Sequence, residues 1–487
     1  MKRSRILLTL LFVALLLLPT ALAAVDGDFE YQELDDGTVI LTNYNGGERD
    51  LALPEELGGK TVSTLSTDAF SRCSELRSVT IPLSIVEIIE NPFRPWDGSN
   101  PFLCCENLEA IHVSPDHPTL AEIDGVLFRK AEKQLLSYPA AKEGASYDVP
   151  QGIAAIEDEA FSGNDKLRSV SLPDSVLTVG RNPFYDCRHL LEITVAEGNP
   201  ALSAVDGVLF RTEDRQLVSY PAGLKKADYA VPDGTVSIGE RAFYQCDALE
   251  SVVLPDSVTE IGEEAFNFCT SLKNLKMSDD VTKIGGSAFL HCESLGEATL
   301  PDGLEHIGEY AFSYCSSLES LAIPSSATEI GEAAFAHNAR LKSATLGDGA
   351  TCVVQYMFYD CSALESVVLP DSVSVIGTRA FYSCRDMTDI ALPKGLTAVE
   401  YEAFALCSAL TDVELPDGLT AIGEGAFNRC GALSRLTIPD SVTEIGEDAF
   451  EKCSNLQLTV SRGSCAAQYA EENSIPFTYP DANDWLN

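Results

Sequence analysis

A phenylalanine that recurs every 23 residues is the strongest constraint on how this chain folds. Ten of these repeat phenylalanines follow one another without an insertion: Phe243, Phe266, Phe289, Phe312, Phe335, Phe358, Phe381, Phe404, Phe427 and Phe450. A fixed period of this size is typical of solenoids, in which no unit can bury its apolar side alone and neighbouring units stack around a shared core. The spacing therefore predicts one coil for every 23 residues.

Each unit combines a short strand with turns. One unit reads Leu249-x-x-Val252-x-Leu254-Pro255-Asp256-Ser257-Val258-x-x-Ile261-Gly262-x-x-Ala265-Phe266-x-x-Cys269. Alternation of apolar and polar positions over residues 249–254 predicts a strand with one buried face, and the proline after it ends the strand. Gly262 permits a tight bend, and Ala265 and Phe266 place a small and a large side chain toward the core. The unit predicts a mainly β coil with short strands and loop or 3-10 segments.

The N-terminal half keeps the same period with interruptions. Phe70, Phe102, Phe161 and Phe184 continue the series, and an insertion before Phe102 carries a second Asn-Pro-Phe at residues 91–93. Two spacings, 102–161 and 184–243, are 59 residues long, and both contain Asp-Gly-Val-Leu-Phe-Arg followed by Ser-Tyr-Pro-Ala. The additional residues predict an inserted β-hairpin in each, with strands near 126–129 and 134–138 in the first.

The breaks in the pattern divide the chain into five parts. An alternating segment before the first repeat predicts a β cap, and a helical pattern at 464–473 followed by a short strand predicts a second cap. The expected parts are a signal peptide at 1–24, an N-terminal β cap at 25–65, irregular repeats with the two 59-residue units at 66–242, ten regular repeats at 243–457, and a helix and strand cap at 458–487.

The first 24 residues have the three parts of a signal peptide. Lys2, Arg3 and Arg5 precede an uncharged apolar run at 6–18, and small residues at 21–24 offer a cleavage site. The apolar run is too short to cross about 30 Å of hydrocarbon. We therefore expect a secreted or cell-surface protein without a membrane span after cleavage.

The chain is strongly acidic. Loss of the three cations in the signal peptide takes the formal net charge from −41 to −44. That much negative potential repels phosphate backbones, so nucleic acid is excluded as a partner, and it discourages self-association. We expect a monomer.

The unit with Leu-x-x-Val-x-Leu-Pro and Ile-Gly-x-x-Ala-Phe-x-x-Cys resembles the bacterial leucine-rich repeats of the BspA-like, Treponema-type family. The likeness extends from residue 62 to about 457 and includes the Asp-Gly-Val-Leu-Phe and Tyr-x-Val-Pro segments. It implies a right-handed leucine-rich-repeat coil in an exported or cell-surface protein that adheres to host matrix proteins or to other cells, without enzymatic activity. Fold-level likeness alone does not identify a binding site.

Most of the 15 cysteines follow a repeat phenylalanine by three residues. Those in the ladder are Cys73, Cys105, Cys187, Cys246, Cys269, Cys292, Cys315, Cys361, Cys384, Cys407, Cys430 and Cys453, with Asn164 and Asn338 at the same position of two other units. In leucine-rich repeats this position is a small buried side chain that meets backbone polar groups at a corner. Free thiols are favoured over disulfides because each would have two equivalent neighbours, although the distance between coils permits a bridge.

Nothing in the sequence indicates catalysis, a metal or a cofactor. His112, Asp116 and His117 could be drawn as a metal site, but the matching unit has Thr194 and Asn199 at the two histidine positions, which favours a loop. No nucleophile with a base and no phosphate-binding glycine loop stands out from the repeats. The acidic turn residues form separated rows rather than the convergent oxygens that calcium needs.

Aromatic residues beside the repeat phenylalanine are the candidate binding residues, because the outward strand positions carry short side chains such as Ser343 and Thr345. These aromatics are Tyr185, Tyr244, Phe268, Tyr314, Tyr359, Tyr382 and Tyr401. Packing between neighbouring coils is the simpler explanation of them, and a binding ridge is the alternative. The expected function is binding of extracellular proteins; a glycan-binding module and an inert surface or accessory scaffold are the other hypotheses.

Overall fold

The computed structural model describes residues 23–71, 73–89, 100–103 and 105–480. It divides into two compact units: unit 1 is 1–144, 152–166 and 178–184, and unit 2 is 145–151, 167–177 and 185–487. Residues 1–22 of the predicted signal peptide, the Asn-Pro-Phe at 91–93 and Cys104 lie outside the described residues. Among the described residues, no helix has the length and apolar character needed to cross a membrane.

Unit 1 begins with an antiparallel sheet that leads into the first coils. The strands of its two N-terminal sheets are β1 (Ala24–Asp26), β2 (Phe29–Glu33), β3 (Val39–Tyr44), β5 (Glu56–Leu57), β6 (Lys60–Ser66) and β8 (Glu87–Ile89), and then β4 (Asp50–Ala52), β7 (Ser78–Ile81) and β9 (Ala110–Val113). Pairing changes from antiparallel at β2 and β3 to parallel at β3 and β6. Val39 and Leu41 are buried there and continue the apolar alternation into the repeat core.

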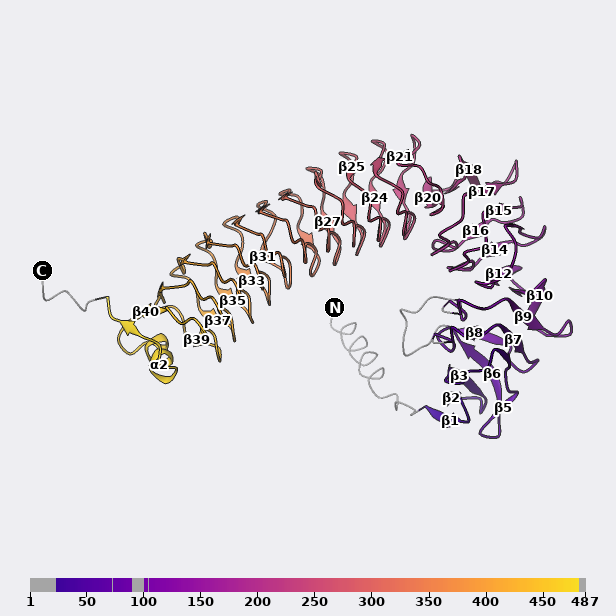
Figure 1. The fold of residues 1–487 in the computed structure, drawn as a ribbon, viewed down its shortest axis with the longest axis horizontal. Coiled ribbons are helices and arrows are strands. Elements are labelled where there is room, and N and C mark those ends of the chain that lie inside the picture. The colour runs from indigo at the N-terminus through magenta and orange to yellow at the C-terminus, as the bar shows by residue number, and fades with distance from the viewer. Residues whose placement is uncertain (1–22, 72, 90–99, 104, 481–487) are drawn as a thin grey trace, which may run out of the picture. The chain divides into compact units, whose positions relative to one another are not determined.

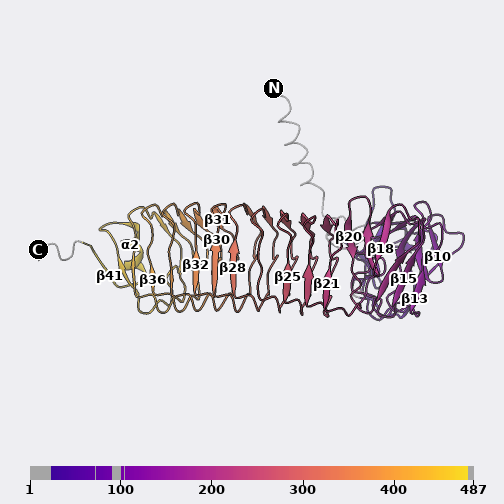
Figure 2. The ribbon, with the colours of Figure 1, turned by 90° about the horizontal axis from the view of Figure 1, so that it is seen from above.

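One face of unit 2 is formed by the strands that the Leu-x-x-Val-x-Leu pattern predicts. They pair in parallel, as in Ser251 with Asn274, so that equivalent residues 23 positions apart lie side by side (Figure 2). These strands are β13 (Ser146–Asp148), β15 (Ser169–Leu172), β17 (Glu192–Val195), β21 (Asp228–Ala230), β23 (Ser251–Val253), β25 (Asn274–Lys276), β28 (Ser320–Ile323), β30 (Ser343–Leu346), β32 (Ser366–Val368), β34 (Asp389–Ile390), β36 (Asp412–Val413), β38 (Arg435–Thr437) and β40 (Gln457–Thr459). The strand predicted for the C-terminal cap, β41 (Phe477–Thr478), pairs with β40 at the end of this face.

A second set of two-residue parallel strands runs along the solenoid, and the sequence pattern did not predict it. Each ends at the apolar residue that the repeat places just before the bend, as Glu260–Ile261 does before Gly262, and turns connect the two sets. The strands in unit 2 are β22 (Ser237–Ile238), β24 (Glu260–Ile261), β26 (Lys283–Ile284), β27 (His306–Ile307), β29 (Glu329–Ile330), β31 (Cys352–Val353), β33 (Val375–Ile376), β35 (Ala398–Val399), β37 (Ala421–Ile422) and β39 (Glu444–Ile445). The coils therefore pair through their backbones on two faces.

The 59-residue units contain the predicted hairpins, and each hairpin has a third strand before it. In unit 1 the three are β10 (Leu120–Ile123), β11 (Val126–Arg129) and β12 (Gln134–Ser137), which continue in parallel into β14 (Ala155–Ile156) and β16 (Thr178–Val179); in unit 2 they are β18 (Leu202–Val205), β19 (Val208–Arg211) and β20 (Gln216–Ser219). Tyr138 and Tyr220 stack on Phe161 and Phe243 at 5.1 and 5.0 Å. They stand 23 residues before those phenylalanines, so each long unit holds a full coil with tyrosine at the repeat position.

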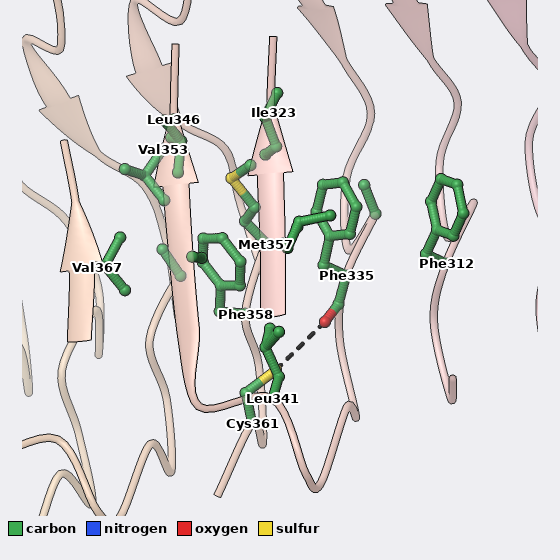
Figure 3. Packing of buried hydrophobic residues seen from close by; sticks show 14 of the residues in the cluster. Phe312, Ile323, Phe335, Leu341, Leu346, Val353, Met357, Phe358, Cys361 and Val367 are labelled. Carbon is green, nitrogen blue, oxygen red and sulfur yellow. Dashed lines mark hydrogen bonds between the residues drawn. The ribbon is translucent and has the colours of Figure 1, made fainter. Parts of the chain in front are cut away.

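The core of unit 2 is a column of stacked phenylalanine rings. From Phe243 to Phe450 the centroids of consecutive rings lie 4.6 to 6.1 Å apart and the ring planes are within 19° of parallel. Figure 3 shows Phe312, Phe335 and Phe358 pointing the same way in successive coils. The fold is a repeat solenoid with 23-residue coils, as predicted (Figure 1).

The last coil is covered by a short helix. Helix α2 spans Cys465–Glu472, and the side chain of its N-cap residue, Ser464, accepts a hydrogen bond from the Ala467 amide. Tyr469 on this helix packs edge-on against Phe450, with ring centroids 6.0 Å apart. An aromatic residue thus closes the end of the phenylalanine column.

Candidate binding surface

Side chains next to the repeat phenylalanine project from equivalent backbone positions in successive coils. From Phe243 to Phe450, the residues two before and two after each repeat phenylalanine have left-handed backbone conformations, as at Glu264 (φ 52°) and Phe268 (φ 59°). Amides at this corner donate to carbonyl oxygens of the next coil, for example from Phe268 to Leu290 at 2.9 Å. Such backbone costs non-glycine residues about 1 kcal/mol each and persists because neighbouring coils fix it.

An unbroken row of rings lies along this corner in unit 2. We call it the aromatic ladder, and its members are Tyr185, Tyr244, Phe268, His291, Tyr314, His337, Tyr359 and Tyr382. Centroids of successive rings are 4.2 to 5.9 Å apart. The ladder includes six of the seven predicted aromatics; Tyr401 lies elsewhere, and the two histidines were overlooked because their position accepts many residue types.

The ladder presents ring edges rather than ring faces to solvent. His291 and Tyr314 each stack in parallel on the rings on both sides, so their faces are covered. Tyr314 is nevertheless 37% exposed, and the other members are half-buried. Aromatic edges carry partial positive charge, and the tyrosine hydroxyl groups add donors, so the exposed part suits hydrogen-bond acceptors and apolar groups.

Carboxylates accompany the two histidines of the ladder. The imidazole Nδ1 of His291 lies 3.8 Å from Glu293, and that of His337 lies 3.6 Å from Asp360. Burial lowers the pKa of His337 despite the opposing effect of Asp360, so this ring is neutral at pH 7. The centre of the ladder therefore carries carboxylates without a compensating histidine charge at His337.

A second group of aromatics surrounds Arg379. Its guanidinium carbon lies 6.0, 5.6 and 5.1 Å from the ring centroids of Tyr356, Tyr382 and Tyr401, and its Nε donates to Glu402 at 2.6 Å. Although burial opposes it, hydrogen bonds with Glu402 and Tyr356 raise the pKa of Arg379. We call these five residues the Arg379 cluster; it is where the predicted residue Tyr401 lies.

The face of unit 2 that the parallel strands form, here called the strand face, has few large side chains that could anchor a partner, as its sequence suggested. Ser343, Thr345 and Ser366 are exposed and short, and Val368, at 60% exposed, is the largest apolar side chain among them. Because interface energy is concentrated in Trp, Tyr and Arg, the aromatic ladder and the Arg379 cluster are the better binding candidates.

The cysteine ladder lies inside the coils. Cys269, Cys292, Cys315, Cys361, Cys384, Cys407 and Cys430 are buried, and each thiol donates to the carbonyl oxygen of the phenylalanine 26 residues earlier, with sulfur to oxygen distances of 3.0 to 3.3 Å. Figure 3 shows this bond from Cys361 to Phe335. Cys246 is more distant, 4.0 Å from the Tyr220 oxygen. The ladder cysteines from Cys246 to Cys453 are free thiols in this structure.

Asn338 replaces the thiol at one coil and makes a different set of bonds. Its amide nitrogen donates to Phe312 and Phe335 carbonyl oxygens at 3.0 and 2.8 Å. Its Oδ1 is buried without a hydrogen-bond partner among the described residues. Asn164 also donates inward, to Pro139 at 2.9 Å, and accepts from the Lys166 amide.

We expect Asn338→Ala to lower the free energy of unfolding by about 2 kcal/mol, because two buried carbonyl oxygens lose their donor. Asn338→Cys should remain within about 1 kcal/mol of the parent, since it keeps one donor and removes the unpaired acceptor. Urea unfolding of the three proteins measures both differences. Equal losses in the two variants would contradict a ladder role for this side chain.

His117 is a structural residue of a loop. It is buried, and its Nδ1 accepts a hydrogen bond from the Leu120 amide at 3.0 Å. Asn199, its counterpart in the matching unit, accepts the equivalent bond from Leu202 at 2.9 Å. In the part of the chain that the structure describes, no group of three or more potential ligands could hold a metal ion.

Comparison with known proteins agrees with this geometry. The family described as BspA type leucine rich repeat region, in six copies, matches residues 57–133, 141–226, 236–353 and 328–457. This chain belongs to the BspA-type leucine-rich repeat family. No curated protein matches this BspA-type chain.

Three solved structures illustrate what the BspA-type protein is similar to. A leucine-rich repeat protein from Bacteroides ovatus is 22% identical, with 94% of this chain and 99% of that chain covered and a TM-score of 0.46. The leucine-rich repeat protein of T. pallidum is 36% identical over 34% of this chain and 78% of its own, with a TM-score of 0.33. A leucine-rich cell surface protein from Faecalibacterium prausnitzii is 21% identical, covering 76% and 94%, with a TM-score of 0.34.

Proposed function

We propose that this BspA-type protein is a non-enzymatic, secreted or cell-surface binding protein that adheres to extracellular proteins of a host matrix or of other cells. The observation that carries the proposal is the aromatic ladder, a row of partly exposed rings that extends from Tyr185 to Tyr382. Weak contacts at each coil add up along such a row, which is how an extended solenoid surface gains affinity.

The composition of the surface favours a protein partner over a glycan. Tyrosine and arginine, which dominate binding energy at protein interfaces, gather in the ladder and in the Arg379 cluster. A sugar that stacks on an aromatic ring needs an open ring face, whereas the inner rings of the ladder cover one another. Preferential retention on polysaccharide would instead favour the glycan hypothesis.

We expect the combined substitution of Tyr244, Tyr359 and Tyr382 by alanine to weaken partner binding at least about tenfold, because a few truncated aromatics usually account for most of the binding energy. The experiment measures binding of the mature chain to immobilised matrix proteins and to polysaccharides across a salt series, since charge-driven binding falls as salt rises. The control replaces Ser343, Thr345 and Ser366 on the strand face by alanine.

Thermal unfolding separates binding from packing in this test. If the triple tyrosine variant binds as the parent does while its melting temperature falls, the ladder serves only to pack the coils and the proposal is wrong. Absence of retention on any matrix protein at physiological salt would favour the inert scaffold.

A further inference from the structure

Main-chain hydrogen bonds join each corner of unit 2 to the coil that follows it. From Phe243 to Phe427, the amides of the repeat phenylalanine and of the residues two before and two after it all donate to carbonyl oxygens of the next coil. In the last such pair of coils Gly425 donates to Glu447, Phe427 to Ala449 and Arg429 to Glu451, at 2.9, 2.8 and 2.8 Å. The corner is therefore an interface between coils that depends on three main-chain donors.

The last coil has the same three donors, but no further coil follows it. The donors are Asp448, Phe450 and Lys452, and the residues 23 positions further on lie in helix α2 and in the segment after it (Figure 1). Asp448 and Lys452 have φ angles of 54° and 62°, and the matching residues of the preceding coil have 61° and 62°. This shared conformation directs their amides as in that coil, away from the coils before them. In the part of the chain that the structure describes, neither amide has a hydrogen-bond partner.

Tyr469 of the cap closes the middle of this corner. Its ring packs edge-on against Phe450 with the centroids 6.0 Å apart, a separation within the range of the phenylalanine column. Burial raises the pKa of Tyr469, and hydrogen bonds with the backbone of Phe450 and Ala449 oppose that rise. The hydroxyl therefore lies at the backbone of the middle donor, and the open donors of the corner are the Asp448 and Lys452 amides.

A pocket of about 320 Å³ lies between the last coil and the cap, and both residues with open amides line it. Its volume is at the low end of the range of about 300 to 1,000 Å³ that is usual for ligand sites. Apolar side chains of the coil and of the cap form much of the lining, namely Phe450, Leu456, Tyr469, Ile475 and Pro476. The open main-chain donors therefore adjoin a pocket that can hold a small side chain.

We propose that this pocket binds a peptide segment of a partner protein, whose main-chain carbonyl oxygens accept hydrogen bonds from the Asp448 and Lys452 amides in place of a following coil. A peptide fits because the site continues the interface by which the coils bind one another, and the two donors match carbonyl oxygens of residues four apart, as in Glu447 and Glu451. Peptides add to an open sheet edge in the same way, with main-chain hydrogen bonds for affinity and an adjoining pocket for specificity.

The lining also restricts which peptide can bind. Tyr469 occupies the place of the next repeat phenylalanine, so the residue between the two accepting carbonyl groups must be small. The charged residues of the lining are Asp448, Glu451 and Lys452, which leave one net negative charge. We therefore expect a segment without net negative charge that has alanine or glycine at the central position.

The probe is a fluorescently labelled peptide that copies the corner at residues 423–429 with alanine in place of phenylalanine, Gly-Glu-Gly-Ala-Ala-Asn-Arg. With blocked ends it has no net charge, and its glutamate and asparagine carbonyl groups are four residues apart. Fluorescence anisotropy measures its binding to the mature chain, and hydrogen exchange followed by NMR measures protection of the amides. At a probe concentration ten times the Kd, we expect the Asp448 and Lys452 amides to exchange about tenfold more slowly than without the probe.

The free protein offers a first check of the same amides. Without the probe, the Asp448 and Lys452 amides should exchange faster than those of Gly425 and Arg429, which donate to the next coil. Absence of saturable binding, or binding that leaves exchange at Asp448 and Lys452 unchanged, would overturn the proposal. Displacement of the probe by N-acetylglucosamine but not by the unlabelled peptide would overturn it in favour of a glycan.

Ser454→Trp is designed to fill the pocket, because Ser454 is exposed and lines it. We expect this variant to bind the probe at least about tenfold more weakly, as for a clash built into a binding site. The matched control is Ser408→Trp, since Ser408 is exposed and stands at the same position of an inner coil, four residues after its phenylalanine. The control should bind as the parent does, and equal affinity of both variants for the probe would overturn the proposal. Melting temperatures near the parent value confirm that both variants are folded.

Failure of this inference is distinct from failure of the proposed function, because the site is at the end of the solenoid and includes no residue of the aromatic ladder. The variant with Tyr244, Tyr359 and Tyr382 replaced by alanine should bind the probe as the parent does, whatever its affinity for matrix proteins. If that variant loses the probe, the probe binds at the ladder and the inference is overturned.

Discussion

Phe335→Ala is expected to lower the free energy of unfolding by about 4 kcal/mol, since it removes a fully buried ring and leaves a cavity. The ring stacks on Phe312 and Phe358 at 5.6 and 6.1 Å, so both neighbouring coils lose contact with the coil between them. In a solenoid, stability is a sum of coil and nearest-neighbour terms. We therefore also expect urea unfolding to separate into two transitions, followed by circular dichroism.

Tyr314→Ala is the matched control, because it removes a stacked ring that is 37% exposed from the coil just before Phe335. We expect this variant to lower the free energy of unfolding by only about 1 kcal/mol, as for a partly exposed aromatic contact. If Phe335→Ala lowered the free energy of unfolding by less than about 1 kcal/mol, the coils would have closed the cavity left by the ring. That result would contradict a rigid phenylalanine column.

The second large effect is a loss of stability at alkaline pH. Burial raises the pKa of Cys315, Cys361 and Cys407 to about 12 in the folded chain, whereas an unfolded thiol titrates near about 8.5. A raised folded pKa gives stability that is complete below the unfolded pKa and declines as pH rises toward the folded one. Between pH 9.5 and 10.5 these three thiols together should remove roughly 4 kcal/mol from the free energy of unfolding.

Urea unfolding under reducing conditions at pH 7.5, 9.5 and 10.5 measures this decline. The control is the variant with Cys315, Cys361 and Cys407 replaced by alanine, which starts less stable and should lose correspondingly less between pH 9.5 and 10.5. If the free energy of unfolding falls equally with pH in parent and variant, the thiols are not the cause of the decline. Titration of unreduced, denatured protein that found most thiols blocked would show that the ladder forms disulfides.

The sequence predicted the parts of the fold that depend on one coil at a time. The 23-residue spacing, the strand before each Pro-Asp turn and the inserted hairpins follow from local alternation and from turn residues. The two-residue strands such as Glu260–Ile261 were missed because a segment that short has no detectable alternation of its own and pairs only when coils stack. Tyr138 and Tyr220 could have been placed by counting 23 residues back from Phe161 and Phe243.

The candidate site was harder to predict because it joins residues of different coils. His291 and His337 belong to the aromatic ladder through rings supplied by the coils before and after them. The Arg379 cluster brings together side chains from consecutive coils at three different positions of the repeat. A repeat pattern gives the residue types at each position, whereas these contacts depend on how the side chains of one coil meet those of the coils before and after it.

Strand pairing between residues 23 positions apart has a consequence for how such a gene changes. Excision of one whole period, such as residues 359–381, joins Phe358 to the next coil in an unchanged register, and duplication of a period does the same. Unequal recombination between repeats can therefore lengthen or shorten the protein without changing the register in which its coils stack. The length of the repeat array and the distance between its binding positions then vary in discrete coil-sized steps, while the coils away from the altered junction keep their neighbours.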